Sequence, residues 1–266
     1  MKTFLYAVAL TFAVSLGQTV SAEIVCTLVI DARTGADIVE EGDCSTRVTP
    51  ASTFKIPLAV MGYDAGFLTE RTAPVLQFRA GDPDWGGANW TRDTDPESWM
   101  RFSVLWYSQR ITHALGVPTL TRYVQSFGYG TADFSGDPGF DNGLERAWIA
   151  SSLLISPREQ AAFLRRLVVD DLPVRPEAMG LARAIVEHHD VRDWVIHGKT
   201  GTAYPRRADR SFDYARGWGW YVGWAAQDDR VLVFVRLTQA RERMEGSPGN
   251  IARAVFLQDW PEMVAP

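Results

Sequence analysis

Strand-like runs of apolar residues, bounded by turn residues, lie toward both ends of the chain, whereas apolar residues in the middle recur at helical spacing. The strand-like runs predict a β-hairpin over 24–46, with its turn at Arg33-Thr34-Gly35, and strands at 193–198, 216–226 and 230–238. Helical spacing predicts helices at 98–115, 118–127, 157–169 and 176–189. Further helices are expected from about Ser52 to Asp64 and near 250–258.

This order of elements predicts a mixed α/β fold of the α+β type. Strands from both chain ends would form one antiparallel sheet that is flanked by helices, and the middle of the chain would form a helical lobe. Loops rich in Gly, Asp, Pro and Asn are expected at 81–96 and 130–143. A cleft between the sheet and the lobe is a common place for a small-molecule site.

Residues 1–22 have the pattern of a secretory signal peptide. Lys2 precedes a short apolar stretch, and Val20-Ser21-Ala22 supplies small residues for cleavage. The alternative, a membrane anchor, is not favoured because the apolar run is shorter than the roughly 20 residues that span a bilayer. We therefore expect residues 23–266 to form a single domain that is secreted, in a periplasm or outside the cell.

The net charge and the distribution of lysine narrow the function. A net charge of −5 argues against nucleic acid or an anionic membrane as partner, and monomer and dimer both remain open. Lysine occurs only at positions 2, 55 and 199, against 24 arginines. A G+C-rich genome would also replace lysine with arginine, but it would not decide where the last lysines stand. Because a buried lysine can lose its proton and arginine cannot, Lys55 and Lys199 are candidates for chemistry.

Ser52-Thr53-Phe54-Lys55 is an S-x-x-K motif at the expected start of a helix. Residues three apart share a helix face, so the Ser52 hydroxyl and the Lys55 amine can meet. The partial positive charge of the helix N-terminus favours a deprotonated nucleophile. Taken alone the motif is common, and Ser52 could serve only as a helix N-cap.

Lys199-Thr200-Gly201-Thr202 carries a K-T-G motif on an expected edge strand. Such an edge presents backbone N–H groups, Gly201 would let a substrate approach closely, and Lys199 and Thr200 could bind a carboxylate. A surface lysine near a turn is the ordinary alternative. Between the two motifs lie three further segments, Phe102-Ser103-Val104-Leu105, Tyr129-Gly130-Thr131 and the run from Trp148 to Ser156.

The five motifs in this order resemble those of the class D, oxacillinase-type, serine β-lactamases, from Pro50 to about Trp224. The resemblance implies that Ser52 attacks the lactam carbonyl and that Lys55 carries a carbamate, formed with CO2, as general base. No other cofactor and no metal is implied. It further implies that Trp148 hydrogen-bonds the carbamate and that Ser103 protonates the ring nitrogen.

The same resemblance places substrate contacts at Tyr129 and Leu105. Lys199 and Thr200 would bind the substrate carboxylate, and the N–H groups of Ser52 and Thr202 would form the oxyanion hole. The sequence departs from the family pattern at Leu105, where valine is usual, and at Thr131, where asparagine is usual. The arginine expected after the last strand has no clean match; we assign Arg243, with Arg241 as the other candidate.

Other classes remain to be separated by experiment. The E-x-x-L-N motif of class A β-lactamases is absent. A β-lactam sensor domain or a cell-wall transpeptidase would share the serine and lysine motifs, but would be acylated without efficient deacylation. Such proteins are usually attached to membrane segments, for which the sequence has no candidate. The histidines, 113, 188, 189 and 197, lack zinc-ligand spacing, and a helix would point the adjacent His188 and His189 apart.

The two cysteines are predicted to form a disulfide. A hairpin centred near Thr34-Gly35 places Cys26 and Cys44 nearly opposite each other, and an oxidising compartment would allow the bond. Two unpaired buried thiols are the alternative.

Overall fold

The computed structural model describes residues 22–265, so almost all of the predicted signal peptide lies outside the described residues. Within them, one antiparallel sheet has the strand order β2-β1-β6-β5-β4-β3. Its strands are β1 (Ala22–Asp31), β2 (Asp37–Gly42), β3 (His188–Val191), β4 (Trp194–Ala203), β5 (Trp218–Gln227) and β6 (Arg230–Ala240). The predicted α+β fold, with a sheet built from both chain ends, is confirmed.

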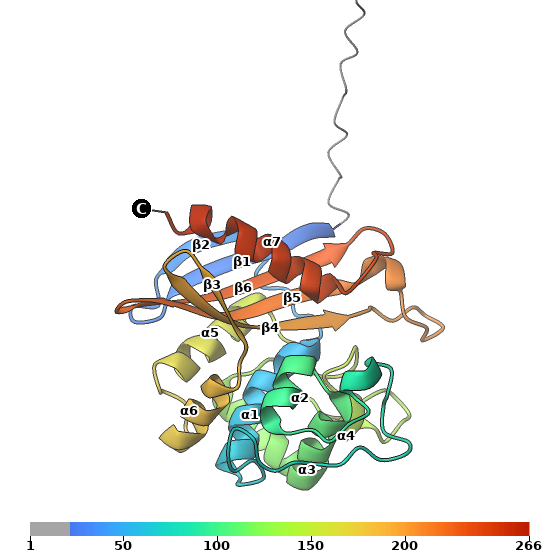
Figure 1. Ribbon diagram of the computed structural model, residues 1–266. Helices are drawn as coiled ribbons and strands as arrows, with labels where there is room; N and C mark the ends of the chain where they lie inside the picture. Colours follow the sequence, from blue (N-terminus) through green and yellow to red (C-terminus); the bar gives the residue numbers. More distant parts are fainter. Residues whose placement is uncertain (1–21, 266) are drawn as a thin grey trace, which may run out of the picture.

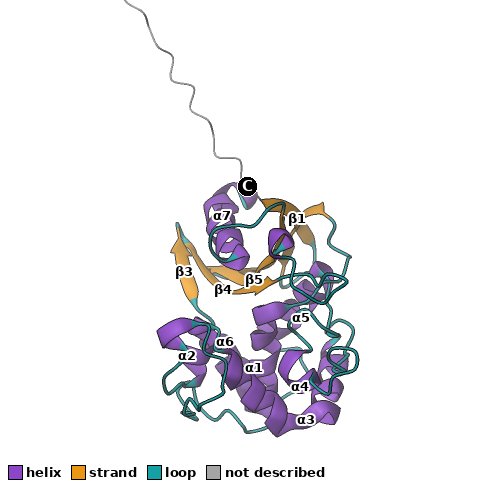
Figure 2. Cartoon of the chain, turned by 90° about the vertical axis from the view of Figure 1, so that its right-hand side faces the viewer, coloured by secondary structure: helices purple, strands orange, loops and turns teal. Residues whose placement is uncertain are grey.

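Helices cover both faces of this sheet. C-terminal α7 (Pro248–Met263) packs on one face, and α5 (Pro157–Val168) packs on the other together with the helical lobe (Figures 1 and 2). The lobe is formed by α1 (Lys55–Asp64), α2 (Pro96–Phe102), α3 (Leu105–Phe127), α4 (Gly143–Arg146) and α6 (Pro176–Ala184). Short 3-10 helices lie at η1 (Ala51–Phe54), η2 (Gly87–Asn89) and η3 (Tyr214–Arg216).

Successive side chains of the central strands point to opposite faces of the sheet and so contribute to two separate cores. Val233 and Val235 of β6 belong to the large core shared with the helical lobe, whereas Leu232 and Phe234 pack under α7. Successive side chains of a strand point to opposite faces, so a strand covered on both sides is apolar throughout. No helix of residues 22–265 has both the length and the apolar character that crossing a bilayer requires.

Two helix predictions are corrected by the structure. The predicted helix 98–115 is interrupted at Ser103, whose backbone is left-handed with φ 56°, so Ser103 lies between α2 and α3. The predicted helix 176–189 ends at Ala184, and His188 and His189 lie in β3, where His188 pairs with His197. Apolar spacing does not detect this pairing, because it depends on a strand that follows later in the chain.

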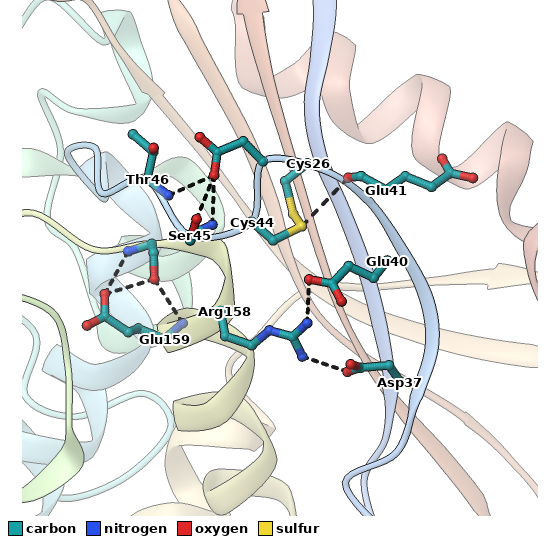
Figure 3. The surroundings of a disulfide bond; sticks show 11 residues. Cys26, Asp37, Glu40, Glu41, Cys44, Ser45, Thr46, Arg158 and Glu159 are labelled. Carbon is teal, nitrogen blue, oxygen red and sulfur yellow. Dashed lines mark hydrogen bonds and ion pairs between the residues drawn. A yellow bond between two sulfur atoms is a disulfide. The ribbon is translucent and has the colours of Figure 1, made fainter.

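The predicted disulfide between Cys26 and Cys44 is confirmed, with Cα atoms 5.1 Å apart (Figure 3). The strand register differs from the expected one, since Cys26 pairs with Gly42 and an irregularity follows Val29. Cys44 therefore lies just beyond the end of β2 rather than on it. The bond joins the outer hairpin to the segment that leads into η1.

Candidate active site

A cavity of about 830 Å³ lies where the β4 edge of the sheet meets the helical lobe. Residues from three separate sequence motifs line it: Ser52, Ser103 and Leu105, and Lys199, Thr200 and Thr202. The cavity thus brings together six of the residues that the sequence singled out, from positions as much as 150 residues apart in the chain.

Ser52 is held at the cavity by a tightly fixed turn. Ala51, directly before it, has a φ of 51°, which is unfavourable for a residue with a Cβ. The Ala51 N–H donates to the Trp148 carbonyl oxygen at 3.0 Å, and the Thr53 hydroxyl donates to the Pro50 carbonyl oxygen at 2.7 Å. Thr53 is buried while Ser52 is partly exposed, so the turn directs one hydroxyl inward and leaves the other at the cavity.

Gly201 makes the close approach of β4 to this turn possible. A Cβ on Gly201 would lie 3.0 Å from both the Pro50 carbonyl oxygen and Thr53 Cγ2. Gly201 is not among the residues that line the cavity. The expectation that Gly201 admits the substrate is therefore corrected: the missing side chain admits the serine-bearing turn.

Lys55 is the first residue of α1 and is only 1 % exposed. Burial, and to a smaller extent the positive charge of Lys199, hold the pKa of the Lys55 amine well below its usual value. No acidic side chain contributes to that shift. The lowered pKa favours the neutral amine, which can accept a proton or react as a nucleophile.

Lys199 lies in β4 and is 5 % exposed, but its surroundings are more polar. Its amine donates hydrogen bonds to Ser103 Oγ and, at 3.0 Å, to the Thr200 carbonyl oxygen. Burial lowers the pKa of Lys199 to about 7, with Glu187 acting to raise it and Arg253 to lower it. The left-handed backbone of Ser103 carries its hydroxyl to this amine.

Trp148 and Tyr129 form a layer beneath η1. Trp148 is 1 % exposed and stacks on Phe54, with ring centroids 5.5 Å apart. Tyr129 is fully buried against the other side of Phe54, and its hydroxyl donates to Gln160 Oε1 at 3.3 Å. Neither lines the cavity. The assignment of Tyr129 to substrate binding is therefore corrected to a supporting position.

The arginine assignment after the last strand is also corrected. Arg243 lies over the Tyr214 ring at 5.4 Å and does not line the cavity. Arg253, one helical turn after Asn250 in α7, lines it instead. Thr202 Oγ1 lies 2.6 Å from Ser247 Oγ and accepts a hydrogen bond from the Gly249 N–H at 3.0 Å, which fixes the start of α7 against β4. The i, i+3 spacing of Asn250 and Arg253 was the signal that sequence reasoning missed.

Sequence reasoning also missed other residues that line the cavity, from loops, α4 and η3. They are mostly aromatic or charged: Trp85, Trp90, Arg146, Glu187, Tyr204, Phe212 and Tyr214. Among residues 22–265, no three His, Cys, Asp or Glu side chains are grouped so that they could hold a metal ion.

The chain is similar to known proteins over most of its length. Residues 25–258 match the family model described as penicillin binding protein transpeptidase domain. Beta-lactamase OXA-9 from Klebsiella pneumoniae is 39 % identical over 90 % of this chain and 88 % of its own. The crystal structure of the OXA-427 class D β-lactamase superposes with a TM-score of 0.83 at 44 % identity, covering 90 % of this chain and 98 % of that one.

A third solved structure shares the fold alone. The C-terminal domain of the Bacillus licheniformis BlaR penicillin-receptor has a TM-score of 0.76 at 22 % identity, over 92 % of both chains. The fold is thus common to hydrolases and to a receptor, whereas the identity to OXA-9 and OXA-427 is much higher. With the motif residues gathered at one cavity, these matches place the chain in the class D serine β-lactamases, enzymes that hydrolyse β-lactams.

Proposed function

We propose that this enzyme opens the β-lactam ring through an ester on Ser52 and that Lys55 acts as general base in the form of a carbamate. The observation that carries the proposal is the burial of Lys55, three residues after Ser52, with no acidic partner, which lowers the pKa of its amine and so favours the neutral form. An ordinary lysine, with a pKa near 10.4, would be protonated at pH 7 and unable to react with CO2.

The proposed reaction begins with attack of Ser52 Oγ on the lactam carbonyl carbon. The ring C–N bond breaks, and the Ser52 proton passes to the general base at Lys55. The Ser103 hydroxyl, hydrogen-bonded to Lys199, delivers a proton to the departing nitrogen and regains one from that base. Lys199 and Thr200 bind the substrate carboxylate. The N–H groups of Ser52 and Thr202 stabilise the oxyanion, each contributing about 3 kcal/mol in comparable sites. Water then hydrolyses the Ser52 ester, and the ring-opened acid leaves.

The surroundings of Lys55 fit a carbamate. When bound, CO2 supplies an anionic base in place of an amine. Trp148 offers an indole N–H as a donor to that anion, and its packing against Phe54 and its carbonyl contact with Ala51 keep it beside the Ser52 turn. Leu105, 8 % exposed on the cavity side, helps to keep the region dry.

We further propose that the protein acts in the periplasm or outside the cell, with a β-lactam as its small-molecule partner. The signal-like residues 1–22 and the Cys26–Cys44 disulfide support export, because disulfides persist in oxidising compartments.

Turnover of a penicillin tests the proposal. Purified protein should show a burst followed by steady hydrolysis of many equivalents, unchanged by EDTA. Ser52→Ala should abolish the reaction, whereas Ser126→Ala, on the exposed end of α3, should not. Release of a single equivalent followed by a stable acylated protein would instead identify a β-lactam sensor or a transpeptidase.

A further inference from the structure

The charged residues that line the cavity fall into two groups. In the first, Glu187 lies 3.6 Å from Arg253 and 3.9 Å from Arg101. Glu187 acts to raise the pKa of Lys199, and Arg253 acts to lower it. In the second, burial and the charge of Arg206 lower the pKa of Arg146, whereas Asp137 acts to raise it. The cavity therefore has two separate positive regions, of which only the first belongs to the proposed carboxylate site.

The second region has more positive than negative charge. Arg146, Arg206 and Arg210 all face one carboxylate oxygen, Asp137 Oδ2, at 3.6, 3.7 and 3.7 Å. These distances exceed those of hydrogen-bonded ion pairs. Burial opposes ionisation of Asp137, but the hydrogen bond from Asn142 and the nearby arginines help to keep its pKa below the usual value. One negative charge is thus shared among three positive ones.

Arg146 is the member of this positive group that lines the substrate cavity. It ends α4, two residues before Trp148, and lines the same cavity as Ser52. Its guanidinium lies over the Phe212 ring at 6.0 Å, and Arg206 lies over the same ring at 3.9 Å. Arg146 Nε is buried and faces Asp137 Oδ2 at 3.6 Å without a hydrogen bond, so the terminal nitrogens of the guanidinium are the ones that a substrate could reach. The two terminal nitrogens of a planar guanidinium are suited to bidentate binding of a carboxylate.

We propose that Arg146, supported by Arg206 and Arg210, forms an anion subsite for the acyl side chain of the substrate. The inference rests on the proposed function, in which the ring carboxylate binds at Lys199 and Thr200. A β-lactam with a second negative charge, a carboxylate or sulfonate on its side chain, would then satisfy both positive regions at once. The enzyme should therefore favour dianionic β-lactams over otherwise matched monoanionic ones.

The test compares benzylpenicillin with its α-carboxy derivative, which differ by one carboxylate. The second-order rate constant for acylation of Ser52 is measured for both, and their ratio cancels any difference in active fraction. Arg146→Gln should lower the ratio of dianion to monoanion about fivefold, as expected for a partly exposed ion pair. Arg146→Lys should restore part of it, and added salt should reduce the wild-type preference.

Arg33→Gln, with the same loss of charge on the distant hairpin turn, is the matched control and should leave the ratio unchanged. An unchanged ratio in Arg146→Gln, or an equal shift in Arg33→Gln, would overturn the subsite while the hydrolase assignment stands. Absence of acylation in the wild type would overturn the proposed function and the subsite together.

Discussion

Lys55 and Lys199 are both almost completely buried, yet their surroundings differ. Lys55 lies under the Ser52 turn, and the only charge that shifts its pKa is the repulsive one of Lys199. Lys199 lies on the cavity wall, where its amine donates hydrogen bonds to Ser103 and Thr200. The acidic Glu187 acts to raise its pKa. Burial disfavours the charged form of both, but only Lys199 has partners for an ammonium group. Neighbours, more than burial, therefore distinguish the two lysines, in line with the proposed roles of Lys55 as a base and Lys199 as a carboxylate-binding cation.

Replacing each lysine in turn should separate these roles, and it should change the kinetics more than any other substitution considered below. Lys55→Ala should lower the rates of both acylation and deacylation about a thousandfold, as expected for loss of a general base. Lys199→Ala should mainly raise KM and leave an acyl-enzyme that still hydrolyses. Stopped-flow acylation and steady-state kinetics distinguish the two. Equal losses in the same steps would remove the division of roles.

Trp148→Phe sharpens the Lys55 side of the comparison. Phenylalanine can retain the stacking on Phe54 but has no indole N–H, so the carbamate would be held less tightly. Deacylation should slow about a hundredfold, with a smaller effect on acylation, and acyl-enzyme should accumulate in intact-mass spectra. Trp260→Phe, in α7 on the other face of the sheet, is the control. Equal slowing of both steps in Trp148→Phe would contradict a role in holding the carbamate.

The pH dependence sharpens the Lys199 side. With a pKa of about 7, Lys199 is charged below that pH and loses its charge as the pH rises, so KM should increase above pH 7. Glu187→Gln removes a group that raises this pKa and should move the rise in KM to lower pH. Bicarbonate should move it to higher pH, because an anion on Lys55 would replace a neutral group nearby. A KM profile that responds to neither change would count against this electrostatic account.

At low pH the carbamate proposed on Lys55 should determine the pH dependence of kcat. Protonation of the nitrogen releases CO2, so kcat should fall as the pH drops and recover when bicarbonate is added.

The disulfide lies in a region remote from both lysines. Its removal should have the smallest effect on catalysis. Cys26→Ser with Cys44→Ser should lower the free energy of unfolding by roughly 3 kcal/mol and leave kcat nearly unchanged. Denaturant unfolding measures the first and penicillin turnover the second. A large loss of kcat in folded protein would show that the hairpin also positions the Ser52 turn.

Sequence alone predicted the sheet, the disulfide and six of the residues that line the cavity, since strand-like runs and the two lysine motifs are local signals. It misplaced Ser103, whose left-handed backbone breaks a stretch with continuous helical spacing. Tyr129 and Arg243 were assigned to substrate, because a motif does not reveal which side chains face a cavity. Arg146 was missed because its importance depends on Asp137 and on the loop carrying Arg206 and Arg210, which meet only in the folded chain.

The central claim, a carbamate on Lys55, is tested most directly by carbon-13 NMR of the active enzyme in labelled bicarbonate. The account predicts one carbamate resonance that disappears in Lys55→Ala, persists in Lys199→Ala and is lost at low pH together with activity. Fully active protein with no carbamate resonance, and with a rate that does not respond to bicarbonate, would contradict the claim and leave Lys55 as a free amine base.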